Sequence, residues 1–115
     1  MKCKLAGVVL LMLAAPLGAH TALQRSSPAS GSVLTASPPV LTLTFIEPTR
    51  LTSLLLVNSA GERALRFTPL AKAKTFSSPK PGLIKGRNEI RWRALSQDGH
   101  VIEGSLIIVL RAPKP

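Results

Sequence analysis

The sequence contains two histidines, His20 and His100, and both lie where a metal ligand would be expected. His20 follows a segment typical of a removable signal peptide, and His100 closes the short turn Asp98-Gly99-His100. If the leader is cut after Ala19, His20 begins the mature chain and carries a free α-amine beside its imidazole. Together with Asp98 and His100, it would then supply nitrogen and oxygen ligands for one divalent metal ion.

Residues 1–19 show the three parts of a secretory signal peptide. Two lysines form a positive head, an apolar run follows, and Ala19 is the small residue expected before a cut. The run is shorter than the roughly 20 apolar residues that a membrane anchor needs. We therefore expect export to the periplasm. Cleavage after Ala15 or Ala22 is the alternative, and it would remove or bury the amine ligand.

Removal of this leader would also remove every sulfur-containing side chain. Cys3, Met1 and Met12 all lie within it, so the exported chain would have no soft ligand for Cu(I). Residues 20–115 are expected to form a single domain. Loss of the two leader lysines lowers the formal charge from +10 for the whole chain to +8 for the mature chain. Its cationic residues are spread out and its aromatic residues are few, which argues against nucleic-acid binding. Attraction to anionic lipid headgroups or to an acidic partner is compatible with this charge.

The apolar pattern of the mature chain predicts an all-β fold. Apolar and polar residues alternate over 41–45, 89–94 and 102–110, as in strands with one buried face. Further strands are expected at 54–57, 63–67 and 75–77, with Glu47-Pro48 ending the first strand, a hairpin turn at 58–62 and an irregular connection over 26–39. Short strands separated by turns favour a β-sandwich with Greek-key connections.

The turn between the last two strands carries the chemistry. Taken alone, Asp98-Gly99 is an ordinary hairpin signal. Because Asp98 and His100 are two residues apart, their side chains project to the same side of an extended segment. Imidazole, amine and carboxylate groups suit Cu(II), which accepts a tetragonal ligand set and binds most tightly among divalent first-row ions. Zinc prefers a tetrahedral set and is the second choice.

These features resemble the CopC family of periplasmic copper-binding proteins. The resemblance rests on the mature N-terminal histidine, the segments SSPASGS and LTFIE, and the run WRALSQDGH before the last strand. It extends from His20 to Leu110. It implies an immunoglobulin-like or cupredoxin-like sandwich of about seven strands, with a Cu(II) site formed by His20, Asp98 and His100. Glu47 matches a position where some members bring an acid near the metal.

The resemblance also implies a function without catalysis. The protein would be a copper carrier or sequestering protein, which delivers copper to an inner-membrane transporter of the CopD type or withholds copper from it. Members with a Cu(I) site have a methionine-rich loop, which the mature chain lacks, so one Cu(II) site is expected. The resemblance places Trp92 near the metal end, where Cu(II) would quench its fluorescence. The alternatives are a copper-dependent polysaccharide monooxygenase, which also uses an N-terminal histidine, and a metal-free sandwich serving adhesion or assembly.

Overall fold

The computed structural model describes residues 22–114, which form seven β-strands. The strands are β1 (Leu23–Ser27), β2 (Val33–Leu34), β3 (Val40–Asn58), β4 (Gly61–Ala64), β5 (Ala73–Pro79), β6 (Gly86–Leu95) and β7 (Val101–Leu110). The expected all-β, sandwich-like fold is confirmed. Within this range there is no helix long and apolar enough to cross a membrane. His20 and the predicted leader lie outside the described residues.

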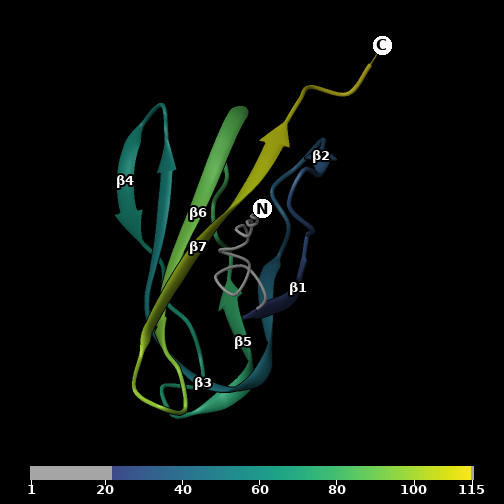
Figure 1. Ribbon diagram of the computed structural model, residues 1–115. Helices are drawn as coiled ribbons and strands as arrows, with labels where there is room; N and C mark the ends of the chain where they lie inside the picture. Colours follow the sequence, from purple (N-terminus) through teal and green to yellow (C-terminus); the bar gives the residue numbers. More distant parts are fainter. Residues whose placement is uncertain (1–21, 115) are drawn as a thin grey trace, which may run out of the picture.

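The long strand β3 belongs to two layers, which Figure 1 shows on either side of the molecule. Its first half pairs antiparallel with β1 and β5, and its second half pairs antiparallel with β4 and β6. β7 continues the second layer beside β6, and the short β2 runs parallel to the end of β7. One strand therefore carries the chain from one layer to the other.

The expected strand end at Glu47-Pro48 is wrong, because β3 bends there and continues. Its pairing with β5 is irregular between Thr44 and Thr49. Pro48 has no N–H to give to a neighbouring strand, so it is tolerated where the ladder is interrupted. The bend places Glu47 at one end of the molecule, outside both ladders.

The core lies between the two layers and follows the alternation seen in the sequence. Phe45 of the first layer meets Trp92 of the second edge to face, with ring centroids 5.2 Å apart, and Phe76 at 5.8 Å. Trp92 is 4 % exposed, which confirms that it faces inward. The other buried apolar residues are Leu41, Leu43, Leu51, Leu54, Leu56, Leu65, Leu83, Ile90, Ala94, Leu106, Ile108 and Leu110. All of them lie between residues 41 and 110.

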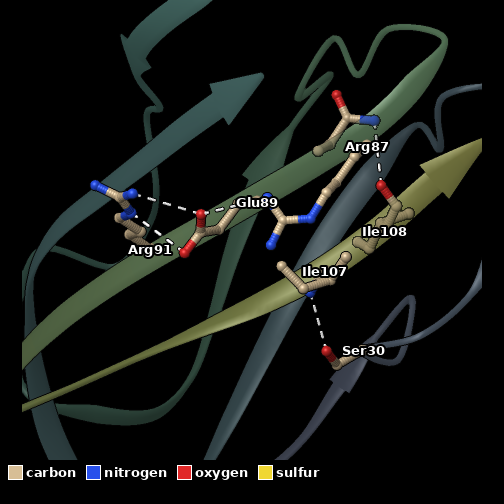
Figure 2. A network of polar contacts seen from close by, with 7 residues as sticks. Ser30, Arg87, Glu89, Arg91, Ile107 and Ile108 are labelled. Atoms are coloured by element: carbon tan, nitrogen blue, oxygen red, sulfur yellow. Dashed lines mark hydrogen bonds and ion pairs between the residues drawn. The ribbon is translucent and has the colours of Figure 1, made fainter. Parts of the chain in front are cut away.

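The connection over 26–39 is less irregular than expected. β1 ends inside it, and β2 forms where the Val109 N–H donates to the Ser32 carbonyl at 3.0 Å. The Ile107 N–H also donates to the Ser30 hydroxyl at 2.9 Å (Figure 2). These residues show no strand alternation of their own, so the partner strands induce the structure. The expected return strand at 63–67 is instead 61–64, and the strand expected at 75–77 extends over 73–79.

Candidate metal centre

Residues 96–100 connect β6 to β7 at the end of the molecule where β3 bends (Figure 1). The loop is closed by two backbone hydrogen bonds: the Ser96 N–H donates to the His100 carbonyl at 2.8 Å, and the Gly99 N–H donates to the Ser96 carbonyl at 3.0 Å. Gly99 has φ +87°, a left-handed conformation that is strained for other residues. The expected Asp-Gly turn is therefore confirmed, with glycine where the backbone requires it.

The Ser96 hydroxyl stabilises the loop through two hydrogen bonds within it. It donates a hydrogen bond to the Asp98 carboxylate and accepts one from the His100 N–H at 3.1 Å. Sequence reasoning did not include Ser96 among the site residues. The signal that could have found it is a serine two residues before an aspartate in a turn, because such hydroxyls bond to nearby backbone groups.

Asp98 and His100 lie on the same side, as predicted, but the turn at Gly99 rather than an extended segment brings them together. The His100 Nδ1 atom lies 3.2 Å from Asp98 Oδ2, and the two side chains are 79 % and 69 % exposed. The Ser96 hydrogen bond, and then the neighbouring His100, lower the pKa of Asp98 from its ordinary value. The carboxylate is therefore ionised at neutral pH. Since Nδ1 faces Asp98, the Nε2 atom on the far side of the ring is directed away from this contact.

Glu47 contacts the same loop through a different residue. Gln97 Nε2 donates a hydrogen bond to Glu47 Oε1 at 3.3 Å. Among residues 22–114, no three His, Cys, Asp or Glu side chains gather into a group that could hold a metal ion. The described part of the site is therefore a pair, Asp98 and His100, with Glu47 attached to its edge. A complete ligand set needs a further donor.

The first described residue lies at this same end. The Ile46 N–H donates to the Ala22 carbonyl at 3.0 Å. Ala22 also lines a cleft of about 240 Å³ together with Ile46, Glu47, Thr49, Ser96, Gln97 and Ile102. The chain thus enters the described fold beside the loop that holds Asp98 and His100.

The donor chemistry of this pair fits Cu(II). It consists of one imidazole and one ionised carboxylate, and residues 22–114 contain no cysteine or methionine. Nitrogen and oxygen donors of this kind suit Cu(II), whereas Cu(I) selects sulfur ligands. Both side chains are exposed, so an ion can reach them from solvent.

Comparison with known proteins gives a consistent result. The CopC domain model matches residues 23–108. A solved structure of CopC from Methylosinus trichosporium OB3b is similar with a TM-score of 0.68 and 24 % identity, over 84 % of this chain and 98 % of that one. PcoC, a methionine-rich copper resistance protein from Escherichia coli, is similar with a TM-score of 0.58 and 28 % identity, over 81 % and 100 %. No curated protein matches the sequence.

Proposed function

Because the chain belongs to the CopC family, we propose that it is a periplasmic carrier that binds one Cu(II) ion as cargo. Its relative PcoC is a copper resistance protein, which supports a role in copper resistance or homeostasis. The observation that carries the proposal is the contact of 3.2 Å between an exposed imidazole and an ionised carboxylate. This pair supplies one nitrogen ligand and a negative charge close to it.

We assign the remaining nitrogen ligands to His20. Two extended residues span at most about 7 Å, so a chain that passes Ala22 beside the loop can bring His20 to it. After cleavage at Ala19, the α-amine and the ring nitrogen of His20 would chelate one ion together. Glu47 is a fourth candidate, since Gln97 already ties it to the loop.

The oxidation state follows from the donors. PcoC is described as methionine rich, whereas residues 22–114 of this chain contain no methionine. Without sulfur ligands a Cu(I) site has no basis, and a tetragonal set of nitrogen and oxygen donors favours Cu(II). We therefore propose a single Cu(II) site and no exchange of oxidation state within the chain.

Within the loop, Ser96 and Asp98 have orienting roles, and His100 supplies the nitrogen that binds the ion. Ser96 fixes the Asp98 carboxylate, Asp98 fixes the ring of His100 through Nδ1, and Nε2 of His100 is left to bind copper. Because the amine and the imidazoles must lose protons to bind, with ordinary pKa values of about 7.7–8.0 and 6.5, affinity should fall as the pH falls.

An exposed site suits a carrier that must release its cargo. The loop lies at one end of the molecule, and the side chains of Asp98 and His100 are largely exposed, so another protein can approach the ion directly. The proposed recipient is an inner-membrane copper transporter of the CopD type. The carrier would deliver copper to it or keep copper away from it.

The alternative of a polysaccharide monooxygenase has less support. Enzymes of that kind present aromatic rings to sugars on an exposed surface. The four aromatic side chains of this sequence are used in packing: Phe45, Phe76 and Trp92 are buried, and Phe67 is half-buried against the core. We therefore propose that the chain has no catalytic role.

A competition titration tests the proposal. The chain beginning at His20 should bind one Cu(II), and His100→Ala should weaken binding about 100-fold or more through loss of a ligand. Asp98→Asn should weaken it too, whereas Glu103→Gln, the same change at a 62 % exposed acid on β7, should not. The proposal fails if His100→Ala binds Cu(II) as tightly as the parent chain.

A further inference from the structure

Four large apolar side chains are exposed at the end of the molecule that holds the loop 96–100: Ile46 lines the cleft beside the loop, and the other three lie outside that cleft. Leu95 and Val101 form the last pair between β6 and β7, directly beside the loop, and are 36 % and 62 % exposed. Leu70, in the segment before β5, is 72 % exposed. Arg50 lies opposite Leu95 on β3 and donates a hydrogen bond to the Leu70 carbonyl at 3.3 Å, which joins these positions. Lys72 follows Leu70 by two residues and precedes Ala73, which pairs with Thr49 next to Arg50. We call Leu70, Leu95, Val101, Arg50 and Lys72 the apolar-basic face.

The two cations of this face carry uncompensated charge. Arg50 and Lys72 are exposed, and neither forms an ion pair with another residue of the described range.

Of the three acids near this end, one is paired with a cation. Asp98 contacts His100, Glu47 accepts a hydrogen bond from Gln97, and Glu103 pairs with Arg93 at 3.4 Å. The Glu47 and Asp98 carboxylates keep their negative charge, but they belong to the loop 96–100 and its cleft, whereas the charged residues of the apolar-basic face are both cations.

We propose that the apolar-basic face docks on an anionic lipid bilayer. Leu70 enters the boundary between headgroups and acyl chains, while Arg50 and Lys72 contact lipid phosphates. Apolar side chains flanked by cations are the combination by which peripheral proteins hold to such surfaces. Because Leu95 and Val101 border the loop 96–100, docking would turn the proposed metal end toward the membrane.

The grouping of these residues, rather than exposure itself, supports the proposal. Single apolar side chains on a protein surface are ordinary. Val40 is 42 % exposed, but it pairs with Pro79 at the far end of β5, away from the loop. It offers a matched control, because it is apolar and exposed but lies outside the face.

The test is co-sedimentation of the chain from His20 onward with vesicles, without copper. This chain retains the whole core, and it lacks the apolar leader, which would bind vesicles by itself. We expect binding to vesicles of phosphatidylcholine with phosphatidylglycerol, weakening as salt is raised, and little binding to phosphatidylcholine alone. Leu70→Ser should reduce binding about tenfold, since it removes an apolar side chain that enters the bilayer. Val40→Ser should leave binding unchanged.

Removing one cation should have a smaller effect. Arg50→Gln and Lys72→Gln should each weaken binding about fivefold, as expected for one charge near an anionic surface. The proposal is overturned if the parent chain does not bind anionic vesicles, or if Leu70→Ser and Val40→Ser behave alike. It is also overturned if binding appears only when a membrane protein is present, which would identify a protein partner. Since no copper is used, the result does not depend on the proposed function.

Discussion

The polar groups at the two ends of β6 differ in burial and in the range of their hydrogen bonds. Near its start, Asn88 is fully buried. Its Oδ1 accepts hydrogen bonds from the Ile84 N–H at 3.0 Å and from Asn58 Nδ2 at 3.2 Å. Its Nδ2 donates to the carbonyls of Ile84, Gly86 and Ile108 at 2.9–3.2 Å. The amide thus bonds to groups from separate segments and holds them together.

Beyond the other end of β6, Asp98 and His100 are exposed, and their polar contacts stay within their own loop. The bonds fix the shape of the loop but leave one nitrogen of the His100 ring facing away from Asp98. Asn88 is therefore a polar group that stabilises the fold, whereas Asp98 and His100 are held in position by their loop and remain accessible to solvent. Only this exposed pair can take up an ion without breaking the fold.

The largest effect expected on stability comes from Asn88→Ala. The change would leave buried backbone groups without partners and should lower the free energy of unfolding by about 3 kcal/mol. Urea denaturation measures it. Asp98→Ala, at the open end, should change stability by less than about 0.5 kcal/mol. Equal destabilisation by the two variants would break the comparison.

A second prediction concerns Gly104, which lies opposite Trp92 between the two ends. A Cβ atom there would stand 2.6 Å from Cζ2 of the indole, so Gly104→Ala must displace the ring. We expect a loss of about 1–3 kcal/mol in unfolding free energy and a shift of Trp92 emission. Unchanged stability and emission would show that the ring has free space in the folded protein.

A third prediction sharpens the role of Ser96. Because its hydroxyl is the main cause of the lowered pKa of Asp98, Ser96→Ala should raise that pKa toward its ordinary value. NMR titration of the carboxylate measures the change. Copper affinity should fall only about threefold to tenfold, since no direct ligand is lost and only the hydrogen bond that orients Asp98 disappears. If Ser96→Ala lost as much copper affinity as His100→Ala, Ser96 would have a role beyond orienting Asp98.

The smallest effect is expected at Glu89, midway along β6. It lies between Arg87 and Arg91, with its carboxylate 3.2 Å from Arg91 Nε (Figure 2). The hydrogen bond from Arg91 lowers the pKa of Glu89 below its usual 4.5. A lowered folded-state pKa stabilises the protein above the unfolded value, and this contribution is lost as the pH falls through the folded value. Glu89→Gln should therefore be slightly less stable at pH 7, and the difference should vanish in acid.

The sequence allowed prediction of the fold where side-chain alternation and composition were strong. β6 and β7 follow from alternation, and the hairpin turn at 58–62 follows from its turn residues. β1 and β2 could not be predicted, because partner strands impose them on a Ser- and Pro-rich segment. The bend at Glu47-Pro48 was missed for a related reason: proline forbids a ladder hydrogen bond, but a strand that changes layers tolerates the loss.

The site was predictable in part. The spacing of Asp98 and His100 predicted that their side chains lie on the same side, and they do, but a turn at Gly99 rather than an extended segment brings them together. The two hydrogen bonds of the Ser96 hydroxyl depend on the geometry of a five-residue loop, which composition does not specify. The link from Gln97 to Glu47 joins residues 50 positions apart, so it required the bend of β3. The roles of His20, Asp98, His100 and Glu47 as metal ligands remain predictions.

Electron paramagnetic resonance of Cu(II) bound to the chain beginning at His20 tests the central claim most directly. We predict a one-to-one tetragonal spectrum with couplings from three nitrogens, two from His20 and one from His100. His100→Ala should lose one of these couplings, and a chain beginning at Thr21 should lose two. A spectrum that is the same in all three proteins, or no tetragonal signal in the parent, would contradict the account.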